Sequence, residues 1–184
     1  MQSRGFSLVE ILTVLVIIGI FMLIAIPGYN TFISSGHIGA EDNDLYHDLE
    51  FARSEASKRG LNIVVCPSNN TSAASPTCAA QATWNGGWIT LLPVNNNCTD
   101  TSGTVLRIRQ PFTSSDTVTF APSTAGNNAL CFNRMGFVPT ANAGLFTFDT
   151  SPVSTSARRC LAVSVIGHLQ ILQSGQKDAA GTQC

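Results

Sequence analysis

The chain has 184 residues, of which 11% are charged, and a formal net charge of −1 at pH 7. A typical soluble domain has roughly 25% charged residues, and the weak net charge excludes a global basic field that would attract nucleic acid. The length allows one domain of ordinary size with an appendage.

The first element is an apolar stretch from Phe6 to Ile26 that contains a single charge, the carboxylate of Glu10. About 20 apolar residues are enough to span the hydrocarbon core of a bilayer. Arg4 is the only cation near either end, which places the N-terminus in the cytoplasm and the rest outside. A cleaved secretory signal fits less well, because its apolar region is usually roughly 7–15 residues long and ends in a small-residue cleavage site. Neither interpretation explains Glu10, since a carboxylate in lipid is costly.

The segment RGFSLVEILTVLVIIGIFMLIAIPGY, residues 4–29, resembles the class III signal of type IV prepilins and type II secretion pseudopilins. In that family a prepilin peptidase cuts the leader after a glycine on the cytoplasmic face, and the apolar helix is kept. The resemblance implies cleavage between Gly5 and Phe6, N-methylation of Phe6, and a helix kink at Pro27. Glu10 then becomes the fifth residue of the mature chain, where the family carries a glutamate.

The resemblance also implies a partner for Glu10, the α-amino group of a neighbouring subunit. A buried charge pair offsets its desolvation only when its geometry is good. Such a pair stabilises an incoming subunit at only one position along its neighbour's helix, so we expect Glu10 to set the register of assembly. The competing interpretation is that Glu10 only snorkels to the headgroups from a helix start near the interface.

Helical periodicity is clear again in residues 41–60. One apolar stripe is formed by Leu45, Leu49, Ala52 and Ala56. Carboxylates occupy the early part and cations the end, as the helix dipole favours, and Gly60 is a suitable stop. A helix from Phe6 to Arg59 would be roughly 80 Å long. We expect its first half to serve a membrane or filament core and its second half to pack under a globular head.

The acidic cluster Glu41, Asp42 and Asp44 lacks the glycine-bearing loop of a calcium site. We therefore expect a solvated helix face there, and predict neither a metal site nor a cofactor. The chain also lacks the H-E-x-x-H and G-x-S-x-G motifs and a Gly-rich phosphate loop. No enzymatic activity is expected.

After Gly60 the apolar period becomes two. Short segments rich in β-branched and aromatic residues alternate with Asn, Gly, Ser, Thr and Pro, which is typical of strands and turns. The predicted strands are 61–66, 87–93, 104–110, 117–122, 129–133, 144–149, 160–166 and 168–173. Gly167, between the last two, indicates a hairpin.

The predicted fold class is therefore α+β. A long N-terminal helix with a protruding apolar half packs against an antiparallel β-sheet head, which with the resemblance implies the pilin fold. The expected organisation is a cleaved leader (1–5), a transmembrane or filament-core helix (6–27), its amphipathic continuation (28–60) and a disulfide-bonded β-rich head (61–184).

All six cysteines lie beyond residue 60 and none forms a C-x-x-C pair. Behind a membrane signal, this pattern indicates disulfides in an oxidising compartment. The first choice of pair is Cys160 with Cys184, which would staple the C-terminal tail to the head. The connectivity of the others is left open; they are Cys66, Cys78, Cys98 and Cys131.

The segments DLEFARSEASKRGLNIVVC and WNGGWITLL resemble the minor pilins and pseudopilins of the FimU, FimT and GspH types. That pattern is an A-R-x-E-A helix end, a strand, then W-x-x-G-W, and we expect Trp84 and Trp88 to be core residues. The closest resemblance is to FimU-like minor pilins. It implies membership of the tip complex that primes a type IV pilus, and hence twitching motility and adhesion.

The alternatives are a GspH-like pseudopilin of type II secretion and a FimT-like minor pilin that binds DNA for transformation. The DNA-binding type carries G-R-x-R near its C-terminus, whereas residues 167–170 here are G-H-L-Q. DNA binding gains most from clustered cations, so DNA is not an expected partner. The remaining candidate patch consists of Arg107, Arg109, Arg134, Arg158 and Arg159.

The resemblance implies other minor and major pilins, the prepilin peptidase and an inner-membrane assembly platform as partners. The expected location is the inner membrane, crossed once with the N-terminus cytoplasmic and the head periplasmic, and afterwards the pilus fibre or its tip.

Overall fold

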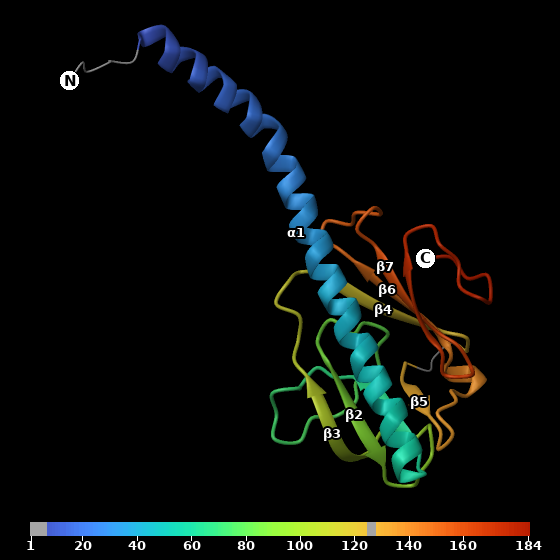
Figure 1. Cartoon of the computed structure of the whole chain (residues 1–184). Coiled ribbons are helices and arrows are strands. Elements are labelled where there is room, and N and C mark those ends of the chain that lie inside the picture. The colour runs from blue at the N-terminus through green and yellow to red at the C-terminus, as the bar shows by residue number, and fades with distance from the viewer. Residues whose placement is uncertain (1–6, 125–127) are drawn as a thin grey trace.

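The structure is a computed structural model that describes residues 7–124 and 128–184, without the side chains at 23–28, 30 and 31. One helix, α1 (Leu8–Arg59), is followed by a head of β-strands. Gly60 ends the helix in a left-handed conformation and donates its N–H to the Ala56 carbonyl at 3.0 Å, as predicted for a glycine stop. Figure 1 shows the N-terminal half of α1 curving away from the head.

In its described residues, the head contains eight strands and one short 3₁₀ helix, and the strands are close to the predicted segments. They are β1 (Ile63–Pro67), β2 (Trp88–Pro93), β3 (Gly103–Arg109), β4 (Thr117–Pro122), β5 (Leu130–Phe132), η1 (Thr140–Asn142), β6 (Gly144–Asp149), β7 (Arg159–Val163) and β8 (Leu169–Gln173).

One predicted strand is too long at its C-terminal end. The sequence predicts a strand over 160–166, but β7 stops at Val163. The Ser164 N–H donates to the His168 carbonyl at 3.0 Å, and Gly167 takes a φ of 73°, so the chain reverses there. The apolar residues 165 and 166 therefore lie in the turn, where both are exposed.

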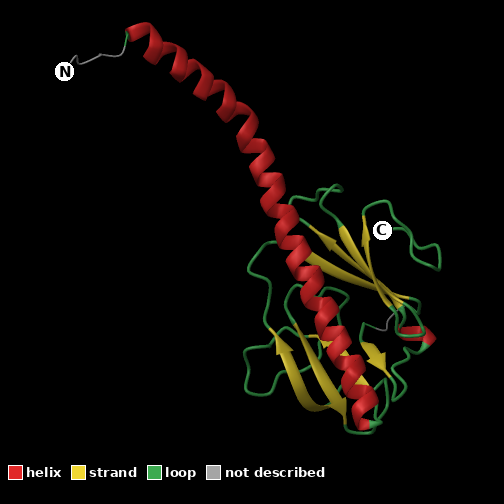
Figure 2. Cartoon of the chain, viewed as in Figure 1, coloured by secondary structure: helices red, strands yellow, loops and turns green. Residues whose placement is uncertain are grey.

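The strands form two antiparallel four-stranded sheets rather than one. Their orders are β3-β2-β1-β5 and β4-β6-β7-β8. The C-terminal half of α1 contacts β1 and β5 of the first sheet and β6 and β7 of the second. Figure 2 shows this arrangement, with one helix laid across two sheets. The α+β pilin fold predicted from the sequence is confirmed, although the division into two sheets was not foreseen.

The core lies between α1 and the two sheets. The predicted stripe is fully buried, because Leu45, Leu49, Ala52 and Ala56 are all 0% exposed. Trp84 and Trp88 are buried in the same cluster, which confirms the core prediction for both. The ring of Trp84 meets Phe146 edge-on at 4.8 Å between centroids, a favoured geometry for aromatic pairs.

All six cysteines are in disulfides, which pair Cys66 with Cys78, Cys98 with Cys131, and Cys160 with Cys184. The first two bonds fasten the loops 68–87 and 94–102 to the outer face of the first sheet. The third holds the C-terminal tail against the second sheet, where Cys184 packs on an apolar cluster that contains Leu145 and Leu172.

Candidate assembly site

The protruding half of α1 presents apolar side chains on all sides. Within residues 8–22, Leu8 is 80% exposed and Phe21 is 68% exposed. A contiguous apolar surface of this kind marks an interface with a membrane or another protein. Among the described residues, no helical segment is long and apolar enough to count as a candidate membrane span.

Glu10 lies in the first turn of α1 and is exposed. The Thr13 hydroxyl donates to the Glu10 carbonyl at 2.9 Å, but the Glu10 side chain forms no ion pair with any residue that the structure describes. Its role in register remains a prediction.

The processing residues are not placed. Gly5 and Phe6 lie outside the described residues, so the structure leaves the cleavage site untested. The helix is continuous at Pro27, whose side chain is not described. The kink assigned to Pro27 is therefore still a prediction.

A buried carboxylate ties α1 to the first sheet. Asp48 is 1% exposed and receives a hydrogen bond from the Trp88 indole N–H at 2.9 Å. Arg109 Nε donates to the same oxygen, Asp48 Oδ2, at 3.1 Å. Arg107 Nε lies 2.9 Å from Asp48 Oδ1 as an ion pair without hydrogen-bond alignment, and Arg109 also pairs with Asp44 at 3.2 Å. We call Asp48, Arg107, Arg109 and Trp88 the helix–sheet lock.

The residues of the lock come together because of the helical period of α1 and the alternation of side chains along β3. Asp48 precedes Leu49 of the buried stripe, so it lies at the edge of the face that packs on the head. Arg107 and Arg109 are two residues apart on β3, so their side chains leave the same face of the strand. The guanidinium of Arg107 also lies 5.1 Å from the centre of the Phe51 ring, a cation–π contact. This lock was not predicted from the sequence, in which the two arginines at alternate positions of β3 were the available signal.

The prediction of a solvated acidic face is wrong for two of its three residues. Glu41 is 8% and Asp42 is 1% exposed, while the Asp44 side chain is 48% exposed. The error arises because loop 110–116 and the second sheet cover this part of the helix. The Ser114 hydroxyl donates to Glu41 Oε1 at 2.6 Å. Burial nevertheless raises the pKa of Glu41 above its usual value, against the lowering effect of this hydrogen bond.

Asp42 is a buried carboxylate with a strongly raised pKa. Burial raises the pKa of Asp42 to about 7, although the nearby charge of Arg159 opposes the rise. Its Oδ1 atom has no hydrogen-bond partner among the residues that the structure describes. A buried, incompletely paired carboxylate destabilises the fold when it ionises.

The stability of the chain should therefore fall as the pH rises from about 4 to about 7. In this range Asp42 retains its proton in the native state but has released it in the unfolded chain. The free energy of unfolding therefore decreases as the pH rises. Because one pKa unit corresponds to about 1.4 kcal/mol, Asp42→Asn should be more stable than the wild type by up to about 4 kcal/mol at pH 8. The two proteins should be similar at pH 4. Denaturant unfolding at several pH values measures the difference, and parallel curves would contradict it.

Most arginines of the candidate DNA patch interact with carboxylates of the same chain. Arg107 and Arg109 belong to the helix–sheet lock, and Arg158 pairs with Asp149 at 2.7 Å. Arg159 lies close enough to Asp42 to affect its pKa. Of the five arginines, only Arg134 is both exposed and without an ion pair among the described residues. The set is therefore not a continuous basic surface.

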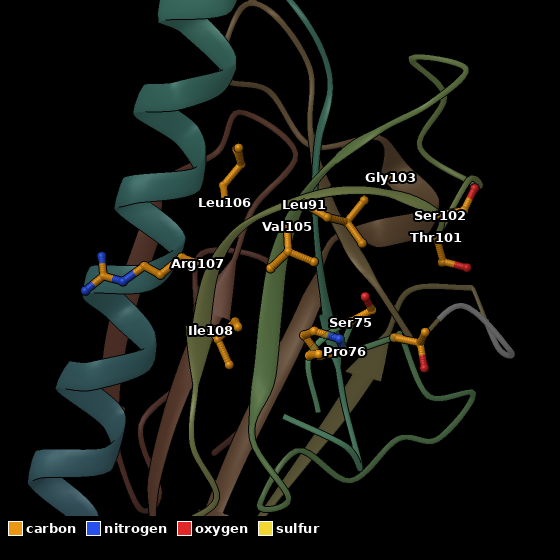
Figure 3. A pocket seen from close by; sticks show the side chains of 12 residues that line it. Ser75, Pro76, Leu91, Thr101, Ser102, Gly103, Val105, Leu106, Arg107 and Ile108 are labelled. Atoms are coloured by element: carbon orange, nitrogen blue, oxygen red, sulfur yellow. The ribbon is translucent and has the colours of Figure 1, made fainter. Parts of the chain in front are cut away.

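An open cavity of about 630 Å³ lies between residues 74–77 and β3. Figure 3 shows Val105 and Ile108 on its β3 side, Ser75 and Pro76 opposite, and Arg107 reaching towards α1. Among the described residues, the lining provides hydroxyl groups, apolar side chains and Arg107, but no acid, histidine or cysteine. Over the described ranges, no group of three or more His, Cys, Asp or Glu could hold a metal ion.

Comparison with protein families gives two matches that together cover most of the chain. Residues 42–167 match the family described as type II transport protein GspH, and residues 1–26 match the prokaryotic N-terminal methylation motif. No curated protein matches the chain.

Two solved structures share the fold. Both are crystal structures of the type IV minor pilin FimU of Pseudomonas aeruginosa PAO1, in different space groups. The first is 18% identical, covers 77% of this chain and 92% of its own, and has a TM-score of 0.57. The second is 19% identical, covers 73% and 91%, and has a TM-score of 0.53. At this identity the likeness establishes the fold alone.

Proposed function

Because the chain belongs to the family of the type II transport protein GspH, we propose that it is a minor pilin that joins the tip complex of a type IV pilus and promotes pilus assembly. Twitching motility and adhesion would then depend on it indirectly. The family consists of pilins and pseudopilins, which are structural proteins. The proposed activity is therefore insertion into a filament, not turnover of a substrate.

The observation that carries this proposal is the protruding half of α1. It is a surface of exposed apolar side chains with Glu10 as its one charged group. The helix–sheet lock and the buried stripe fix the head on the other half of the same helix. Such a molecule can move from a bilayer into a bundle of like helices with its head unchanged, because both environments are apolar.

The proposal includes processing and topology. A prepilin peptidase would cut after Gly5, Phe6 would be N-methylated, and the head would lie in the periplasm until an inner-membrane platform adds the subunit to the fibre. Major pilins and other minor pilins would be its neighbours. The matched methylation motif over residues 1–26 supports this processing, and three disulfides suit an oxidising compartment.

Counting surface pili by electron microscopy tests the proposal directly. A strain deleted for this gene should carry few or no pili, and the intact gene should restore them. A normal pilus count in the deletion strain would contradict a role in assembly.

The second candidate function is that of a pseudopilin in type II secretion. The description of the matched family favours it, and the same helix and head would serve in either filament. Release of secreted proteins, measured in the same deletion strain, separates the two: a secretion defect with normal piliation would favour the pseudopilin.

A further inference from the structure

Three apolar side chains are exposed on α1 just before the helix reaches the head. They are Tyr29, Phe32 and Ile33, which are 65%, 75% and 38% exposed. Positions i, i+3 and i+4 lie on one face of a helix. The next buried residue of α1 is Ile38, which lies about two and a half turns beyond Tyr29 and so on the opposite face. The three side chains therefore point away from the face of α1 that packs on the head.

The distance from Glu10 to these side chains matches the thickness of a membrane. Tyr29 lies 19 positions beyond Glu10, or roughly 29 Å along the helix. The hydrocarbon core of a bilayer is about 30 Å thick. Between Glu10 and Glu41 the sequence has no Asp, Glu, Lys or Arg. A bilayer that covers residues 11–28 thus leaves Glu10 at one boundary of its core and Tyr29 at the other.

The residue types at the second boundary are those that favour it. Tyrosine is enriched where hydrocarbon meets the headgroups, because its ring has an apolar body and a polar tip. Phe32 and Ile33 lie about one turn beyond Tyr29 on the same face. The sequence becomes polar at this level, with Asn30, Thr31, Ser34 and Ser35. A contact with a neighbouring protein helix would require neither the spacing from Glu10 nor this change in composition.

The head begins where the headgroups of such a bilayer would end. Ile38 lies six positions beyond Phe32, or roughly 9 Å along the helix. A bilayer is about 40–45 Å thick with its headgroups, which leaves roughly 5–8 Å of headgroups on each side of the core. Figure 1 shows the head gathered around the later part of α1, with the earlier part extending away from it. The head can therefore rest at the membrane surface with its fold unchanged.

We propose that Tyr29, Phe32 and Ile33 form an interfacial belt that holds the chain at a fixed depth in a phospholipid bilayer, with the belt at the periplasmic headgroups and Glu10 at the cytoplasmic headgroups. The belt rests on the proposed function, since the chain must be in the inner membrane before it enters a filament. At this depth the Glu10 carboxylate stays in contact with water. It needs the amino group of a neighbour only when the helix leaves the bilayer.

Tryptophan fluorescence of the full chain in phosphatidylcholine vesicles tests the belt. The native residues Trp84 and Trp88 are at most 1% exposed, so brominated lipids should quench only an added tryptophan. Phe32→Trp keeps an aromatic ring in the belt. Its emission should be quenched about twofold or more strongly by bromine near the headgroups than by bromine near the ends of the acyl chains.

Two further positions calibrate the depth. Ile20 is 55% exposed and lies midway between Glu10 and Tyr29, so Ile20→Trp should be quenched more by the deep bromine than by the shallow bromine. Ala40 is exposed and lies beyond the belt. Ala40→Trp is the matched control, and neither lipid should quench it.

A double substitution tests whether the aromatic side chains themselves set the depth. In the Ile20→Trp chain, Tyr29→Ser with Phe32→Ser should raise the quenching by shallow bromine by about 1.5-fold or more. The direction of the slide does not matter, because either direction moves position 20 away from the centre of the bilayer. Asn43→Ser, at an exposed position beside the head, should leave the quenching unchanged.

Three results would overturn the belt while the proposed function stands. They are equal quenching of Phe32→Trp by the two lipids, strong quenching of Ala40→Trp, and an unchanged depth of position 20 after the double substitution. If the doubly substituted chain keeps its depth but is lost from purified pili, the aromatic side chains contact a neighbouring helix instead of lipid. Failure of the wild-type chain to float with the vesicles would overturn the membrane stage of the proposed function together with the belt.

Discussion

Glu10→Ala is expected to leave the chain processed and stable but to reduce its incorporation into filaments by about a hundredfold or more. In the proposed filament, the mutation would leave the neighbour's α-amino group buried without a counter-charge. Removing one member of a buried pair costs about 3–5 kcal/mol, and about 1.4 kcal/mol is a tenfold change in an equilibrium constant. The measurement is the ratio of the protein in sheared pili to the protein left in membranes, determined by immunoblotting.

Two further variants separate charge from packing. Glu10→Gln keeps the size of the side chain and should be almost as defective as Glu10→Ala, because it lacks the charge. Thr13→Ala removes the hydrogen bond from the Thr13 hydroxyl to the Glu10 carbonyl and should incorporate normally. Normal incorporation of Glu10→Ala would rule out a register role for Glu10 and favour the snorkelling interpretation.

Asp48→Ala is expected to lower the free energy of unfolding by about 3 kcal/mol. The substitution removes the acceptor of the Trp88 N–H and the ion-pair partner of Arg107, and it leaves Arg109 with Asp44 as its remaining carboxylate. Loss of one partner of a buried ion pair costs about 3–5 kcal/mol, and the lower figure applies because Arg107 and Arg109 are 41% and 29% exposed. Denaturant unfolding of the full chain in detergent, followed by tryptophan fluorescence, measures the change.

Glu50→Ala is the matched control for this prediction. Glu50 is on the same helix, but its side chain is 40% exposed and its ion pair with Arg53 spans 3.8 Å. Pairs of this kind contribute about 0–1 kcal/mol, so the variant should unfold nearly like the wild type. A free energy of unfolding for Asp48→Ala within about 1 kcal/mol of the wild type would show that the lock does not stabilise the fold.

Local patterns predicted most of the secondary structure. Periods of 3.6 and two residues identified the helix and the strands, because alternation of apolar side chains follows directly from backbone geometry. The same reasoning failed at 164–166, which continue the alternating pattern of β7 but form a turn. That pattern contains no information about the two backbone hydrogen bonds that close the reversal, from the Ser164 N–H to the His168 carbonyl and from the Gly167 N–H to the Ser164 carbonyl.

Short-range patterns were enough to predict the long helix, its buried stripe, the core tryptophans, the antiparallel β-head and the lone carboxylate of the apolar half, since each depends on residues close together in the chain. Only the folded chain shows that the head forms two sheets, that Asp42 is buried, that Asp48 meets Arg107 and Arg109, and that turns 133–137 and 164–168 lie side by side. Those contacts join residues tens of positions apart. Their positions depend on how the strands pair and on which face of α1 each sheet covers. Short-range periodicity predicts neither the pairing of the strands nor the covered face.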